Sequence, residues 1–242
     1  MGKKAFSLAE TLITLTIIGV IAVLTVPNLI KKYEDQQTIT GVKTAYSLLD
    51  NALKLMYQEE GNPQDWAWPA TTAEKGDFFM KKLSNYLKVE KYCGNADGCF
   101  KYGYFTNWTY FYISFDGRKG ANYHWTERNR YGKTILKNNM HICLHNINID
   151  DKRGIGTIRV DINGQKQPNR IGYDTFFFHI NNKGLNLNVP DATSASNAHG
   201  LVFSPEHCYT QNTSHNSGHS CSTWIIKHGN IDYKYRDVRG EW

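Results

Sequence analysis

Glu10 is the residue whose position most needs a chemical explanation. It is the one charged residue between Ala5 and Leu24, in a stretch that reads AFSLAETLITLTIIGVIAVL and is long enough to cross a bilayer. A charge at membrane depth costs several kcal/mol, so an acid in such a stretch is a functional-site hypothesis that needs a partner. The sequence therefore predicts that this carboxylate pairs with a positive group, because a desolvated pair is tolerable only when both members are present.

A second group of side chains has the chemistry of a metal site. The oxygens of Asp161, Asn163 and Asp174 are hard ligands suited to calcium. Calcium takes about six to eight oxygens, so carbonyls and water would have to join them. The alternative is a hairpin turn, in which Asn163 and Gly164 supply positive φ and Asp161 caps the turn. Both interpretations stay open, with the plain turn favoured over a structural calcium.

The cysteines all follow the apolar stretch. There are five, Cys93, Cys99, Cys143, Cys208 and Cys221. In an exported domain they are expected to form disulfides. The sequence does not fix their connectivity, but Cys93 with Cys99, and Cys208 with Cys221, close short local loops. Cys143 is left over within an apolar run, which favours a buried thiol over a reactive one.

Other chemistry is less well supported. Histidine and cysteine side chains near the C-terminus raise a zinc hypothesis, on His207, Cys208, His215, His219 and Cys221. An exported cysteine pair is more often oxidised, so the disulfide is favoured over zinc. The sequence has no nucleophile elbow, no H-E-x-x-H and no glycine-rich phosphate loop, so we expect no enzyme.

These residues are positioned first by a long helix. After the membrane-length stretch, apolar residues repeat at three- and four-residue spacing, as in an amphipathic helix, at Ile39, Val42, Tyr46, Leu49, Leu53 and Met56. Gly61-Asn62-Pro63 ends the pattern. We expect a helix over 6–60, with a transmembrane part at 6–30 and an amphipathic part at 31–60, softened at Pro27.

The rest of the chain, 61–242, is predicted to be a β-rich globular domain. A short helix near 74–87 comes first, with Phe78, Leu83 and Leu87 inward. Short β-branched or aromatic runs between turn signals then indicate an antiparallel meander, at 102–105, 110–115, 142–149, 156–162 and 175–180. Residues 191–199 and 210–222 are predicted loops. The fold class is α+β, and the net charge of +6 does not demand a nucleic-acid partner.

The N-terminus resembles the class III signal of type IV pilins and type II secretion pseudopilins. The basic leader Met1-Gly2-Lys3-Lys4 and the small Ala5, at 1–5, precede Phe6, with Glu10 as the fifth residue from Phe6. Pro27 matches a helix-weakening proline of many pilins, whereas Ala5 stands where glycine is commoner. The D-x-N-G, P-N and G-x-D segment over 160–176 and the closing segment over 221–233 resemble parts of bacterial pilin-like proteins.

The resemblance implies a pilin-like fold, a long N-terminal helix packed on an antiparallel sheet with disulfide-bounded loops. It implies cleavage between Ala5 and Phe6 by prepilin peptidase, methylation of Phe6, and pairing of its amine with Glu10 of a neighbouring subunit. The partners would be copies of the chain, related pilins and an inner-membrane assembly platform. The Cys208–Cys221 pair would resemble the C-terminal disulfide region of type IV pilins, and major pseudopilins as a group have a calcium-binding loop in this half of the domain.

The implied protein is a structural subunit of a type IV pilus or a type II secretion pseudopilus. It would cross the bacterial inner membrane once, with its globular domain in the periplasm or outside. Three alternatives are a conventional secretory signal, for which no small-x-small site is present, a simple anchor, which does not need Glu10, and a minor pilin-like module that binds DNA or a surface glycan through aromatic and basic side chains.

Overall fold

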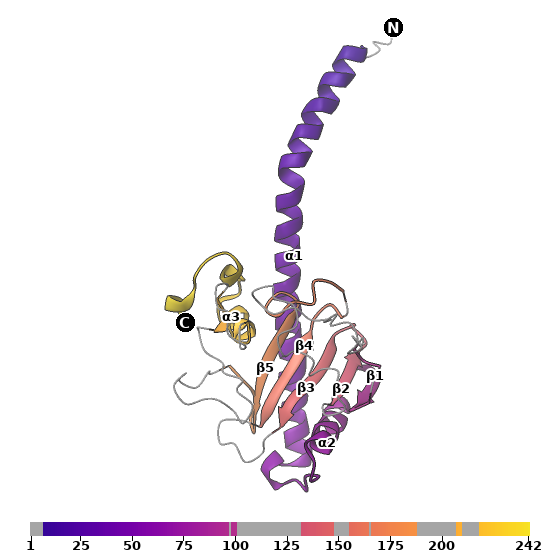
Figure 1. The fold of residues 1–242 in the computed structure, drawn as a ribbon, viewed down its shortest axis with the longest axis vertical. Coiled ribbons are helices and arrows are strands. Elements are labelled where there is room, and N and C mark those ends of the chain that lie inside the picture. Colours follow the sequence, from indigo (N-terminus) through magenta and orange to yellow (C-terminus); the bar gives the residue numbers. More distant parts are fainter. Residues whose placement is uncertain are drawn as a thin grey trace, which may run out of the picture. The chain divides into compact units, whose positions relative to one another are not determined.

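In this computed structural model the chain divides into two compact units, Met1–Thr38 and Ile39–Trp242. The structure describes residues 7–96, 98–100, 132–147, 155–164, 166–187, 207–209 and 218–242, with backbone alone at 145 and 146. One helix, α1 (Leu8–Glu60), runs through both units over 53 residues (Figure 1).

In the first unit α1 carries apolar side chains on every side. Its leucine, isoleucine and valine residues from Leu8 to Ile30 are largely exposed, and α1 is the one helix among the described residues that is long and apolar enough to cross a membrane. Its threonine hydroxyls donate to carbonyls one turn back, from Thr11 to Ser7 (2.9 Å), Thr14 to Glu10 (2.9 Å), Thr16 to Leu12 (2.8 Å) and Thr25 to Ile21 (2.8 Å). These hydroxyls therefore need no water, as a bilayer requires. The helix also continues through Pro27 without a break.

In the second unit, 39–60 of α1 packs on a six-stranded antiparallel sheet in the order β1-β2-β3-β4-β5-β6. The strands are β1 (Val89–Gly94), β2 (Lys133–Leu136), β3 (His141–Ile147), β4 (Gly156–Asp161), β5 (Thr175–Asn181) and β6 (Gly184–Asn186). Each strand pairs with its neighbour in sequence, so the sheet is a meander.

One face of the sheet is apolar and covers the amphipathic stripe of α1. Alternate residues of β3, β4 and β5 belong to the same buried core as the stripe, at Ile142, Leu144, Ile158, Val160, Phe176, Phe178 and Ile180. The rings of Tyr46 and Phe178 lie 6.5 Å apart across this contact. The predicted stripe is confirmed, because its members are buried except for Tyr46, which is partly buried.

The opposite face is buried but rich in polar groups. Cys143, Arg159 and Phe177 lie side by side on β3, β4 and β5, and the Arg159 guanidinium carbon is 5.8 Å from the centre of the Phe177 ring. Lys133 and Arg159 each keep only 2% of their surface exposed. Burial raises the pKa of the Cys143 thiol to about 12, although both cations act to lower it. Cys143 is a free thiol and is fully buried, as the sequence analysis favoured.

At the end of α1, Gly61 has a φ of 82° and donates its N–H to the carbonyl of Tyr57. This is the left-handed stop that glycine favours. A short 3-10 helix, η1 (Pro63–Asp65), and then α2 (Thr72–Ser84) follow, with α2 beside β1 and β3 (Figure 1). Four aromatic rings of this part of the chain form a cluster: Trp66, Trp68, Phe78 and Phe79. The Lys82 ammonium lies 5.0 Å from the centre of the Trp66 ring.

The structure corrects several sequence predictions. Within α2, Phe79 and not Phe78 is fully buried. The strands β1, β2 and β6 were not predicted, nor was α3 (Cys221–His228), which begins where a loop was expected and lies beside β5. Two 3-10 helices, η4 (Asp232–Lys234) and η5 (Arg239–Glu241), close the chain. The strands predicted at 102–105 and 110–115, and the loop at 191–199, lie outside the described residues.

Asp50 joins α1 to the sheet edge. Its Oδ1 accepts a hydrogen bond from the backbone N–H of Leu185 at 3.1 Å, and its Oδ2 lies 2.6 Å from Lys54 Nζ. Gly184 has a φ of +126°, and a Cβ there would come within 2.7 Å of the Asp50 carboxylate. The close approach of β6 to α1 therefore depends on both residues.

We expect Asp50→Ala to lower the free energy of unfolding by about 1–3 kcal/mol, because the partly buried Leu185 N–H loses its acceptor. The matched control Lys54→Ala, which removes a side chain that is 59% exposed, should cost less than about 1 kcal/mol. Urea denaturation of the full chain in detergent, followed by circular dichroism, measures both. Equal losses for the two variants would mean that the ion pair and not the Leu185 contact matters.

Candidate functional site

The first turn of α1 holds the assembly residue predicted from the sequence. The expected cleavage residues Ala5 and Phe6 lie outside the described residues. Ser7 N–H donates to Glu10 Oε2 at 2.8 Å, and Glu10 N–H donates to Ser7 Oγ at 3.2 Å. These reciprocal bonds form a capping box, which satisfies two of the N–H groups that the start of a helix leaves without partners.

The capping box makes the sequence argument for Glu10 incomplete. That argument had only charge pairing to explain the carboxylate, and the structure adds a local role as a helix cap. The same arrangement begins α2, where Thr71 and Glu74 bond reciprocally. The pattern Ser7-Leu8-Ala9-Glu10 is itself a capping-box signal and could have revealed this role.

The cap uses only part of the Glu10 carboxylate. Oε2 accepts the Ser7 N–H, whereas Oε1 has no hydrogen bond among the described residues, and the side chain is exposed. A negative charge in the first turn also interacts favourably with the helix dipole. The site can therefore cap the helix and still offer an oxygen to an outside cation.

The β4–β5 loop brings together the side chains predicted to bind calcium. Asp174 Oδ2 accepts the backbone N–H of Asn169 at 2.7 Å, and its Oδ1 accepts that of Arg170 at 2.6 Å. Asp161 Oδ1 accepts the backbone N–H of Asn163 at 3.2 Å. Each carboxylate thus holds a turn of the loop.

The Asn163 amide lies between the two carboxylates. Its nitrogen is 3.5 Å from Asp174 Oδ2 in one orientation and, after rotation of the amide, 2.9 Å from Asp161 Oδ1. Positive φ values at Gly164 (72°) and Asn169 (48°) turn the backbone on either side. Asn163 and Gly164 were both expected to supply positive φ, but in the structure Asn163 does not and Asn169 does.

Asp174 is a buried carboxylate whose oxygens accept backbone N–H groups. Burial raises the pKa of Asp174, while the hydrogen bonds from Arg170, Asn169 and Asn163 act to lower it. Both oxygens of Asp174 already face N–H donors, which point hydrogens at the place where a cation would sit. The described contacts of both carboxylates are those of a turn.

The structure contains the disulfides Cys93–Cys99 and Cys208–Cys221. Because Cys208 and Cys221 bond to each other, their sulfurs are not available as zinc thiolates, which removes the zinc hypothesis in the form that used them. The ring of His219 lies 4.3 Å from that of Phe177, His207 also belongs to the described residues, and His215 lies outside them.

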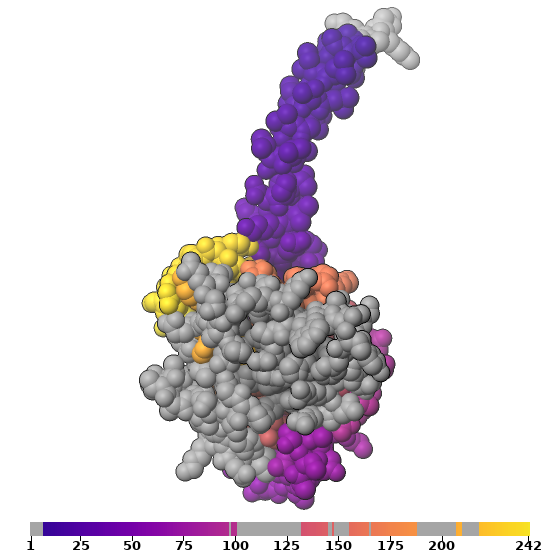
Figure 2. All heavy atoms as spheres, viewed as in Figure 1, coloured from indigo at the N-terminus to yellow at the C-terminus, as the bar shows by residue number. Residues whose placement is uncertain are grey.

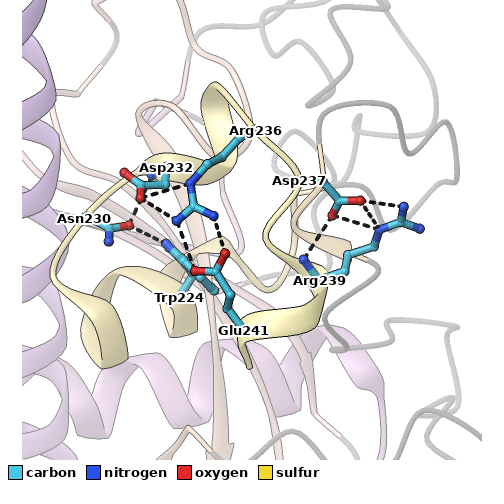
Figure 3. Close-up of polar contacts among 7 residues, drawn as sticks. All are labelled: Trp224, Asn230, Asp232, Arg236, Asp237, Arg239 and Glu241. Atoms are coloured by element: carbon cyan, nitrogen blue, oxygen red, sulfur yellow. Dashed lines mark hydrogen bonds and ion pairs between the residues drawn. The ribbon is translucent and has the colours of Figure 1, made fainter.

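The C-terminal segment is fixed by charged and aromatic contacts (Figure 3). The Arg236 guanidinium lies between Asp232, at 2.7 Å, and Glu241. Trp224 of α3 donates its indole N–H to Asn230 Oδ1 at 2.7 Å. The Tyr233 hydroxyl, which is buried, donates to the Gly172 carbonyl at 2.8 Å. The closing segment is thereby tied to the β4–β5 loop, so the two segments that resembled pilin-like proteins are in contact.

Comparison of the chain with models of protein families, with curated proteins and with solved structures found no match.

If the β4–β5 loop is held by hydrogen bonds alone, Asp174→Asn should lower the free energy of unfolding by about 1–3 kcal/mol, because the amide nitrogen meets an N–H donor. The loss should be the same in excess calcium and in excess EGTA, as measured by thermal unfolding. A melting temperature of the unaltered chain that rises with calcium, and loses that rise in Asp174→Asn, would instead establish the calcium site on Asp161, Asn163 and Asp174.

Proposed function

We propose that this chain is a structural subunit of a type IV pilus-like or type II secretion pseudopilus filament, anchored in the inner membrane and polymerised through its N-terminal helix. The observation that carries the proposal is the composition of α1. It is apolar on all sides over a membrane length, has Glu10 in its first turn, and continues as an amphipathic helix packed on an antiparallel sheet. A soluble protein has no use for the first part, and a simple anchor needs a helix cap at its start but not a carboxylate in particular.

Three further observations support the proposal. The threonine hydroxyls of α1 are satisfied within the helix, so the helix suits a lipid or helix-packed environment. The Cys208–Cys221 bond encloses a segment near the C-terminus, as the resemblance to pilins implies. The globular unit is an antiparallel meander on a helix, in keeping with the implied α+β fold.

In the proposed filament, subunits join by heterologous contacts that generate an open helical polymer. The amine of Phe6, exposed by prepilin peptidase, is the cation that meets Glu10 of a neighbour. The capping box holds the Glu10 side chain along the first turn, which limits its rotamers before it meets the amine. The part of the subunit that polymerises is then 6–30, with the globular unit on the outside.

The first test concerns processing. The basic leader and the small Ala5 lead us to expect that mass analysis of membrane-extracted protein finds a methylated Phe6 as the first residue. The measurement requires cells that possess a prepilin peptidase. A chain that still begins at Met1 or Gly2 in such cells would contradict the proposal.

The second test separates the charge of Glu10 from its capping role. Glutamine also serves in a capping box, so Glu10→Gln keeps the cap and removes the charge. Ser7→Ala does the reverse, weakening the cap by about 1 kcal/mol while the charge stays. We expect Glu10→Gln to insert normally and to assemble poorly, and Ser7→Ala to insert and assemble close to normally.

The measurement is the fraction of subunits in sheared or crosslinked filaments relative to total membrane-bound protein, with each variant as the only copy. Normal filament yield in Glu10→Gln would mean that the charge does not recruit subunits. Equal loss in both variants would make helix capping the reason for Glu10.

A further inference from the structure

The end of the globular unit that contains Ile39 carries a set of exposed lysines. Contacts between segments that are distant in sequence bring these lysines to the same end of the unit. Gly41 of α1 lies against Ile162 in the β4–β5 loop, and the Lys43 ammonium is 3.4 Å from where a Cβ on Gly229 would lie, just after α3. Lys166 in the loop and Lys227 in α3 are therefore brought to the same end as Lys43. Figure 2 shows both segments, the loop in orange and the C-terminal segment in yellow, at the surface of this end.

The β2–β3 turn adds two more lysines to this end. Asn139 of the turn donates its side-chain N–H to the carbonyl of Asn163 at 3.1 Å, which ties the turn to the β4–β5 loop. Lys137 of the same turn donates its backbone N–H to the carbonyl of Lys88 at 2.9 Å. We refer to Lys43, Lys88, Lys137, Lys166 and Lys227 as the lysine end, and each of these side chains is exposed.

The positive charge of the lysine end is not offset by the carboxylates described around it. Asp161 and Asp174 are buried in the β4–β5 loop, and Asp232, Asp237 and Glu241 pair with Arg236 and Arg239. The exposed carboxylate that lies closest in sequence to a member of the lysine end is Glu90, two residues after Lys88. None of the ammonium groups of the lysine end has an ion pair among the described residues.

The other end of the globular unit has a different charge. There, where α1 stops and α2 begins, five carboxylates outnumber the three lysines of α2: Glu59, Glu60, Asp65, Glu74 and Asp77 against Lys75, Lys81 and Lys82. Lys82 is paired with Glu60. The globular unit is thus polarised along α1, and its positive end is the end where the chain comes from the apolar segment.

The lysine end is joined to the apolar segment by a short link, so it stays close to whatever surrounds that segment. Ile30 is the last residue of the apolar run and Ile39 the first of the globular unit, so the link is at most about 32 Å even if fully extended. We propose that the lysine end docks on the anionic headgroups of the membrane that holds α1. This inference rests on the membrane anchoring in the proposed function, and it adds a second, electrostatic contact with lipid.

Clusters of lysine next to a membrane segment bind anionic lipids, and the attraction decays within a Debye length. Docking would hold the globular unit on the bilayer before assembly and release it at high ionic strength. A nucleic acid is the competing polyanion, but nothing in the connectivity brings it to this end, whereas the link brings the bilayer there.

The test is lysine footprinting of the full chain reconstituted in vesicles. An acetylating ester modifies exposed lysines, and mass spectrometry compares rates in phosphatidylcholine alone with rates in phosphatidylcholine plus phosphatidylglycerol. We expect the lysine end to react at least about threefold more slowly in the anionic vesicles, with the difference lost in high salt. The exposed Lys81 and Lys183, on α2 and in the β5–β6 turn, should react equally in both.

A charge-matched pair of variants sharpens the result. Lys43→Glu with Lys166→Glu should remove most of the protection of Lys137 and Lys227, whereas Lys81→Glu with Lys183→Glu, which changes net charge equally, should leave it. Equal reaction of the lysine end of the unaltered chain in both vesicles would overturn the proposal. So would protection by a DNA duplex in neutral vesicles without protection by anionic lipid, which would assign this end to nucleic acid.

Flotation of the vesicles distinguishes this failure from failure of the proposed function. A chain that floats with both vesicles but shows no lipid-dependent protection keeps its anchor and loses only the lipid docking. A chain that floats with neither contradicts the membrane anchoring, and the docking inference with it.

Discussion

A single helix, α1, carries two different patterns of apolar side chains. Over its first part α1 exposes apolar side chains in every direction, and over its second part it is apolar along one stripe that the sheet covers. The rest of the globular unit depends on that stripe, because strands β3, β4 and β5 must present their apolar residues to it together. A shift of one residue in any strand would turn its apolar side to the polar face and leave the stripe uncovered.

The parts of the fold that the sequence predicts well are those with a local signal. The stripe of α1 and its end at Gly61 follow from periodicity and a glycine stop, and β3, β4 and β5 follow from runs of β-branched and aromatic residues. The missed elements lack such signals. β2 begins with Lys133, a buried lysine that sequence rules place outside, and β1 pairs with β2 across a long interval of sequence.

The C-terminal helix α3 shows another limit of sequence analysis. It follows a stretch of serine, asparagine and histidine, which predicts a loop. The burial of its side chains depends on contacts with residues that are distant in sequence. The Cys208–Cys221 bond and the bond from the Ser222 hydroxyl to the Phe177 carbonyl attach it next to β5. Gly229, at a φ of 69°, ends it and was a local signal available in the sequence. In the β4–β5 loop, likewise, the residue types were evident, but not that both oxygens of Asp174 accept backbone N–H groups.

The two capping boxes of this chain help to define what is unusual about Glu10. At α2, Glu74 bonds Thr71 and keeps its charge in water, so glutamate costs nothing extra there. At α1, the same bonds to Ser7 form at the head of an apolar helix, where a glutamine could also cap and would carry no charge into the proposed membrane. Capping therefore explains the direction of the Glu10 side chain but not its charge. The helix dipole accounts for part of the preference for a negative charge, and in the proposed filament the remaining partner would be the N-terminal amine of a neighbouring subunit.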